Sequence, residues 1–153
     1  MVRGLPLQPR SVVGMYCSHV LEHLALEDLR VALLNVNSYM SPGGIFRIVL
    51  PDLERIAREY VESDNPTAAE SFMRSTMLGR DVRQRGIEAM LRAWLGNSQH
   101  LWMWDYKSLE HELRRAGFRN IRRACFGDAH DPRFHDVEDR DRFDECLAME
   151  CMR

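Results

Sequence analysis

The sequence predicts a single α/β domain built around a short, largely parallel sheet. Two apolar runs, at residues 12–17 and 45–50, have the near-continuous hydrophobicity of strands that are covered on both faces. Between them, from residue 26 to 40, apolar side chains recur at alternating spacings of three and four, which indicates a helix packed on the sheet. Strand, helix and strand together predict a βαβ unit.

Length and composition fit one domain and exclude several classes of protein. The 153 residues contain no linker, repeat or low-complexity run. The formal net charge is −2 with acids and bases interspersed, so we expect no nucleic-acid partner and no anionic membrane surface. No apolar stretch approaches the roughly 20 residues that span a bilayer, and the first residues lack a signal-peptide core, which predicts a cytoplasmic protein.

Turn signals delimit the elements that follow the first helix. The sequence "SPGG" at residues 41–44 ends that helix, since proline cannot continue it and glycine accepts the left-handed conformation. Asp52 is placed to cap a helix after the second strand. Thr67 and Glu70 have capping-box spacing and predict a helix to about residue 78, and a further helix is expected over residues 81–95.

These helices form a predicted helical insertion over about residues 62–97 in an otherwise single domain. A helix over residues 106–116, stopped by Gly117, then leads to two strands near 119–126 and 146–152. The expected sheet therefore has about four strands, a parallel pair followed by a C-terminal antiparallel pair. The four cysteines lack CxxC spacing, which favours reduced, buried thiols over disulfides or zinc ligands.

The stretch Ser18-His19-Val20-Leu21-Glu22-His23-Leu24 directly follows the first strand. A buried strand thus delivers two histidines and a glutamate to a turn at its carboxyl end, the edge at which open α/β sheets bind ligands. On spacing alone, His19, Glu22 and His23 match the H-x-x-E-H motif of inverzincin metalloproteases. That motif lies within a helix and needs another acidic ligand, whereas here a strand precedes it, so we predict no metal site.

A longer match favours another interpretation. Residues 11–54, read as "SVVGMYCSHVLEHL…SPGGIFRIVLPDLE", resemble the second half of a class I S-adenosylmethionine-dependent methyltransferase, particularly a bacterial group with an "SHVLEHL" turn. Leu5-Pro6-Leu7 and "SPGG" correspond to the "LPF" and "KPGG" of that family. The resemblance continues in "HLWMWDYKSLEHELRRAGF" and covers nearly the whole chain.

The resemblance implies a truncated Rossmann-like methyltransferase fold, S-adenosylmethionine as cofactor, and methyl transfer to an unidentified acceptor. It places Ser18, His19 and Val20 beside the cofactor, with His19 as the candidate base or acceptor-orienting group. A histidine at such a turn also commonly caps the helix or bonds a backbone carbonyl. Glu22 and His23 are expected to be structural.

Two later segments offer further candidates. His100, Trp102, Trp104 and Tyr106 are candidates for a lid over an acceptor pocket, because aromatic side chains combine apolar area with polar tips. Packing of this loop onto the sheet is the alternative. An acidic segment follows residue 126 without EF-hand or zinc spacing, and we expect it to be a solvated loop. Its acidic and histidine residues are Asp128, His130, Asp131, His135, Asp136, Glu138, Asp139 and Asp141.

The glycine-rich turn that cradles the cofactor in the family has no counterpart in the first 40 residues, and Val13 stands where the family usually has an acid. The chain therefore resembles the C-terminal part of the fold. The edge of strand 12–17 is then expected to expose unpaired backbone groups, which favours a homo-oligomer or a complementing chain that pairs with it. Two classes stay open: a methyltransferase, or an inactive methyltransferase-like remnant that serves as an oligomeric or partner-binding module.

Overall fold

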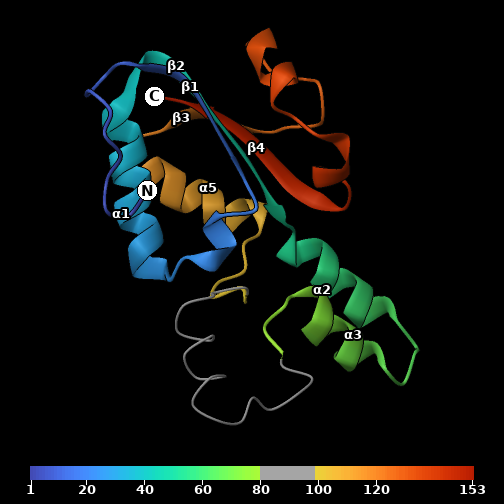
Figure 1. Cartoon of the computed structure of the whole chain (residues 1–153). Helices are drawn as coiled ribbons and strands as arrows, with labels where there is room; N and C mark the ends of the chain where they lie inside the picture. Colours follow the sequence, from blue (N-terminus) through green and yellow to red (C-terminus); the bar gives the residue numbers. More distant parts are fainter. Residues whose placement is uncertain (80–98) are drawn as a thin grey trace, which may run out of the picture.

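A computed structural model describes residues 1–79 and 99–153 (Figure 1). Within these residues, no helix is long and apolar enough to cross a membrane. The elements are β1 (Val12–Ser18), the 3-10 turn η1 (Leu21–His23), α1 (Leu26–Tyr39), β2 (Met40–Pro51), α2 (Leu53–Glu62), α3 (Ala68–Ser75), α5 (Tyr106–Arg115), β3 (Arg119–Arg123), the 3-10 turns η2 (Pro132–Asp136) and η3 (Arg140–Arg142), and β4 (Cys146–Met152).

The strands form one mixed sheet in the order β1-β2-β4-β3. β1 runs parallel to β2, with Ser18 opposite Val49, and β4 runs antiparallel to both β2 and β3. The α/β fold class and the four-strand sheet are confirmed. Within the described part of the chain β1 is an edge strand, because it is paired only with β2.

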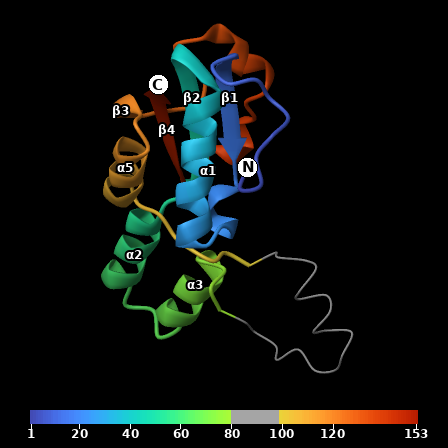
Figure 2. The same cartoon turned by 90° about the vertical axis from the view of Figure 1, so that its left-hand side faces the viewer.

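One face of the sheet is covered by α1 and α5 (Figures 1 and 2). The helical stripe expected between residues 26 and 40 is the buried face of α1, which explains why that helix lies flat on the sheet. The main hydrophobic core between these layers contains Leu29, Leu33 and Val36 from α1, Leu109 and Leu113 from α5, and Phe46, Ile48, Leu50, Met149 and Cys151 from the two central strands.

The opposite face is covered by the segment of residues 124–145, which carries η2 and η3 (Figure 1). The expectation of a solvated acidic loop agrees with the exposure of most of its charged residues, but it is wrong for Glu138. The side chain of Glu138 is completely buried against Arg47, which is itself 0% exposed in the middle of β2. A buried guanidinium requires compensating carboxylates, so the acidic segment folds back over the sheet to supply them.

Arg47 is the centre of this buried ion cluster. Its Nη1 donates to Glu150 Oε2 at 3.1 Å, and its Nη2 donates to Asp128 Oδ1 at 2.9 Å. Its Nε donates to Glu138. Arg122 closes the cluster from β3, donating to Glu150 and to Asp128, each at 2.7 Å. The cluster therefore joins β2, β3 and β4 to the segment that covers them.

Acid is expected to destabilise the fold through this cluster. Burial alone would raise the pKa of Glu150 and of Asp128, but the hydrogen bonds that His130 and Arg122 donate to Glu150, and Arg122 and Arg47 to Asp128, outweigh it and lower both pKa values. Groups with lowered native pKa values stabilise the fold above their ordinary values of 4.5 and 3.8, and lose that contribution as the pH falls through the native values. Urea unfolding from pH 7 to pH 3 should show this decline, and Asp128→Asn should make it shallower. A free energy of unfolding that is flat over this range contradicts the assignment.

The turn signals are mostly confirmed. α1 ends at Tyr39, although residues 41–44 continue directly as the first part of β2, with Gly43 at a φ of +75°. The Asp52 carboxylate accepts a hydrogen bond from the backbone N–H of Glu54 at 3.0 Å, as expected of an N-cap. Thr67 is the N-cap residue of α3 but makes no side-chain capping bond. α3 ends at Ser75, before the expected residue 78.

The helices of the predicted insertion are only partly described. α2 and α3 lie beyond the carboxyl end of β2 and do not cover a face of the sheet (Figures 1 and 2). They pack on each other, with the rings of Tyr60 and Phe72 5.5 Å apart. The helix expected over residues 81–95 lies outside the described residues. α5 and the stop at Gly117, whose φ is +92°, are as expected.

The cysteines follow the sequence expectation in part. All four are free thiols, and Cys17 and Cys151 are buried as expected. Burial raises the pKa of Cys17 to about 12, with the Glu22 carboxylate adding to the rise, so this thiol is inert. Cys125 is exposed, because β3 ends at Arg123 and not at residue 126. Cys146 is half-buried at the start of β4.

Candidate functional site

The candidate site lies where β1 and β2 end side by side. The backbone N–H of His19 donates to the carbonyl of Val49 at 2.8 Å and makes the last contact of β1 with β2. His19 then adopts a φ of +53°, a conformation that is uncommon for any residue except glycine. This left-handed residue turns the chain out of the sheet and into η1. Val20, the next residue, is exposed at the surface.

The His19 ring is held between two acceptors. Its Nε2 lies 3.1 Å from the carbonyl of Arg142, and its Nδ1 lies 3.4 Å from Glu22 Oε1. The neighbouring Cys146 sulfur and the Glu22 carboxylate raise the pKa of His19 to about 10. Because both ring nitrogens face acceptors, the ring is a double donor and carries a proton on each. A protonated imidazole cannot accept a proton at neutral pH, so this geometry does not favour general-base catalysis by His19.

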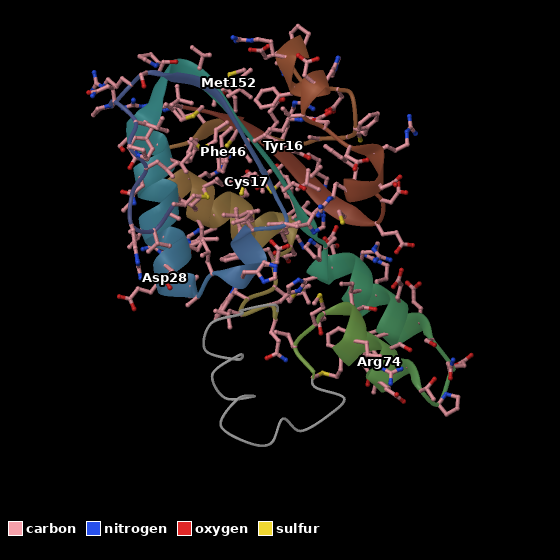
Figure 3. All side chains as sticks on the ribbon, in the orientation of Figure 1. Tyr16, Cys17, Asp28, Phe46, Arg74 and Met152 are labelled. Carbon is pink, nitrogen blue, oxygen red and sulfur yellow. The ribbon has the colours of Figure 1, made fainter. Side chains whose placement is uncertain are left out.

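Two buried hydroxyls lie on the opposite face of β1 from the main core. Figure 3 shows Tyr16 on the side of the covering segment and Cys17 and Phe46 on the helical side. Burial raises the pKa of Tyr16, and the neighbouring Ser18 hydroxyl opposes part of that rise. Neither hydroxyl makes a hydrogen bond of normal length and angle within the described residues. The Ser18 Oγ is therefore a buried polar group at the strand end without a well-formed hydrogen bond in the described part of the chain.

Glu22, His23 and His100 come together behind this strand end. The backbone carbonyl of Glu22 accepts hydrogen bonds from the N–H groups of Leu101 and Trp102, at 2.8 and 3.2 Å, which fixes the loop against η1. The His23 and His100 rings meet edge to face with centroids 5.0 Å apart. Burial lowers the pKa of His100, so its ring is neutral at neutral pH. Sequence reasoning placed His100 in a lid and did not connect it with Glu22.

The other three predicted lid residues lie in different environments. Trp104 is only 2% exposed and belongs to the main core, whereas Trp102 is 42% exposed. Their ring centroids are 6.1 Å apart. The Tyr106 hydroxyl donates to the carbonyl of Ile121 at 3.4 Å. Of these three rings, that of Trp102 is the most exposed.

A groove that we did not predict from the sequence runs beside the free edge of β1. Its volume is about 260 Å³, and the η2 segment forms its second wall. The one signal in the sequence was Gly14, because glycine inside a strand often marks a close approach of another segment. A Cβ at this position would lie 3.2 Å from the Phe134 ring. The groove is lined by Val13, Gly14, Tyr16, Asp131, Arg133, Phe134 and Val137.

Comparisons with known proteins agree with this architecture. A family model described as a methyltransferase domain matches residues 13–123. A search of curated proteins found no match. Among solved structures, an S-adenosylmethionine-dependent methyltransferase from Archaeoglobus fulgidus is similar at 16% identity and a TM-score of 0.50, over 96% of this chain and 62% of that one. An S-adenosylmethionine-dependent methyltransferase from Mesorhizobium loti is similar at 17% identity and a TM-score of 0.50, over 100% and 67%.

A third similar structure is a complex of the Haloferax volcanii Trm112 methyltransferase activator with a methyltransferase, at 13% identity and a TM-score of 0.53, over 99% of this chain and 57% of that one. At these identities the structures show a shared fold, and this chain spans 57%, 62% and 67% of the lengths of the three. The family match extends from β1 to β3 and includes the strand end with the "SHVLEHL" turn. The chain therefore belongs to the family described by this methyltransferase-domain model.

Proposed function

We propose that this chain forms the part of an S-adenosylmethionine-dependent methyl-transfer site that lies at the carboxyl end of β1. The observation that carries the proposal is the unpaired, buried Ser18 hydroxyl, at the sheet edge where open α/β folds bind their ligands. The family match, which includes this strand, supports it. A polar partner from the cofactor at this point would satisfy a group that otherwise costs free energy to bury.

The cofactor, when bound, supplies a sulfonium methyl group for in-line displacement, and the protein then contributes mainly position and exclusion of water. Ser18 would donate a hydrogen bond to a polar group of the cofactor, and Val20 would offer an exposed apolar wall. Both N–H groups of the doubly protonated His19 face protein acceptors, so His19 holds the turn at the end of β1 instead of orienting the methyl acceptor. An acceptor that must lose a proton needs a base other than His19.

The free edge of β1 is the proposed attachment point of a complementing chain. In the described residues, the β1 backbone is paired only with β2, and Val13 is 51% exposed beside it. An added strand would gain main-chain hydrogen bonds along this edge, and the groove under Phe134 would receive one of its side chains. The complementing chain would supply the glycine-rich turn of the family and complete the cofactor site. A second copy of this chain on the same edge is the other occupant.

Calorimetric titration with S-adenosylmethionine and S-adenosylhomocysteine tests the cofactor assignment, with light scattering of the same sample for its mass. Saturable binding is expected, and Ser18→Ala should weaken it about 2- to 10-fold, the worth of one hydrogen bond. Ser38→Ala, which removes an exposed hydroxyl on α1, is the matched control and should leave the affinity unchanged. If a stable oligomer binds neither compound, the chain is an oligomeric or partner-binding module and the cofactor assignment is wrong.

A charge on the β1 edge is expected to abolish association. Val13→Lys places an ammonium in the row of unpaired backbone groups, a device by which natural edge strands avoid pairing. Size-exclusion chromatography with light scattering should then show the monomer. Val61→Lys introduces the same charge at an exposed apolar position on α2 and should not change the mass. An unchanged oligomer in Val13→Lys would place the interface elsewhere.

We also propose a cytoplasmic location. All four cysteines are free thiols, and Cys125 is exposed to oxidants. Such thiols persist in a reducing compartment. Localisation of a fluorescent fusion would test this, and export of the fusion would contradict it.

A further inference from the structure

We propose that Glu22, His23 and His100 form a site for a divalent transition-metal ion, with zinc as the fitting ion. The three side chains come from η1 and from the loop that precedes α5. One ligand atom of each lies within 4.8 Å of the others. The sequence expectation was that this chain has no metal site, because a strand precedes the H-x-x-E-H spacing, which in that motif lies within a helix. The structure pairs the last two residues of that motif with a histidine far along the chain.

The Glu22 carboxylate is the strongest sign of a ligand. It is 1% exposed, and neither of its oxygens makes a hydrogen bond within the described part of the chain. The protonated His19 ring faces this carboxylate from one side, with Nδ1 3.4 Å from Oε1, a contact longer than a normal hydrogen bond. Since a buried carboxylate is costly unless it is well paired, this single long contact leaves room for a further partner. A metal ion would supply that partner.

In each of the two histidines a backbone carbonyl faces one ring nitrogen. His100 Nδ1 lies 2.9 Å from the carbonyl of Thr76, and His23 Nδ1 lies 3.1 Å from the carbonyl of Gln99. A carbonyl can only accept, so in both rings Nδ1 carries the hydrogen and the lone pair of the neutral ring is on Nε2. A backbone carbonyl that fixes the tautomer in this way is the common outer-shell partner of a histidine that binds zinc.

The distances and donor types agree with zinc. A tetrahedral zinc ion with bonds of about 2.1 Å holds its ligand atoms about 3.4 Å apart, so the present separations of up to 4.8 Å must close by at most about 1.4 Å. Two imidazoles and one carboxylate are a known donor set of zinc, which leaves a fourth position for water or another ligand. His19 then faces the ligand carboxylate from outside as a hydrogen-bond donor.

The ion would link the turn that follows β1 to the loop at residues 99–104. At present the two backbone bonds to the Glu22 carbonyl hold these segments together. A metal that ties η1 to His100 would stiffen the turn that presents Ser18 and His19. The site does not depend on the proposed methyl transfer, because none of its ligands is assigned a role in that reaction.

Calorimetry of the full chain, stripped with a chelator and dialysed, tests this site by titration with zinc sulfate. One ion per chain is expected, and Glu22→Gln and His100→Ala should each weaken binding at least about tenfold. His111→Ala removes an exposed histidine on α5 and is the matched control for His100→Ala. Zinc should also raise the melting temperature of the wild type and not that of Glu22→Gln.

Cobalt substitution separates this site from adventitious binding at surface histidines. Visible absorption of a tetrahedral cobalt centre is expected in the wild type and in His111→Ala, and not in Glu22→Gln, which preserves the shape of the side chain. Circular dichroism verifies that each variant is folded. Equal zinc affinity in wild type and Glu22→Gln, or no binding by the wild type, would overturn the proposal.

Discussion

Replacing Arg47 by methionine is expected to lower the free energy of unfolding by about 3–5 kcal/mol, the usual cost of removing one partner from a buried ion cluster. Arg47 is 0% exposed, and it contacts Glu138, Glu150 and Asp128. Methionine fills much of the same space but leaves Glu150 and Asp128 with Arg122 as their remaining arginine partner, and Glu138 with none in the described cluster. Because domains of this size are stable by only about 5–15 kcal/mol, the variant should be close to unfolding.

Urea unfolding at pH 7 measures this loss, and Arg55→Met is the matched control. Arg55 pairs with Glu59 and Glu145 at the surface, where an ion pair is worth about 1 kcal/mol or less. Adding Glu138→Gln to Arg47→Met should recover part of the stability, since it removes a buried charge that has lost its partner. Equal losses in Arg47→Met and Arg55→Met would show that the cluster does not hold the covering segment.

The strands and the first helix were predictable because their signals are local. Apolar runs and a spacing of three and four are set by which faces are buried, and Asp52 caps its helix with a bond to the second residue after it. The covering segment was not predictable in this way. Arg47 stood out as a charge in the apolar run of β2, but its partner Glu138 lies near the other end of the chain. Pairing over such distances leaves no periodic signal in the sequence.

In the candidate site, too, some features were predictable from the local sequence and others were not. Ser18, His19 and Val20 could be placed because a strand end and its turn are read directly from the sequence. The protonation of His19 could not, since it depends on Arg142 and Cys146, which reach the ring only in the folded chain. The aromatic loop carries no periodicity that separates buried rings from exposed ones, so the sequence favours packing onto the sheet only slightly over a lid there.

Trp104→Ala is expected to lower the free energy of unfolding by about 3–5 kcal/mol, because the ring is 2% exposed within the main core. Trp102→Ala, two residues earlier, removes a ring that is 42% exposed and should cost about 0.5 kcal/mol or less. Urea unfolding of both variants separates core from lid in one experiment. A lid residue would instead show little loss of stability and weaker acceptor binding.

The indole nitrogen provides a second, sharper test of the same assignment. Trp104 Nε1 is buried without a hydrogen-bond partner within the described residues. Phenylalanine removes this unpaired donor and keeps most of the apolar ring, so Trp104→Phe should retain far more stability than Trp104→Ala. If the nitrogen instead binds a ligand, Trp104→Phe should lose the stabilisation that the ligand gives. Equal stability of Trp104→Phe and Trp104→Ala would contradict the assignment of this ring to the core.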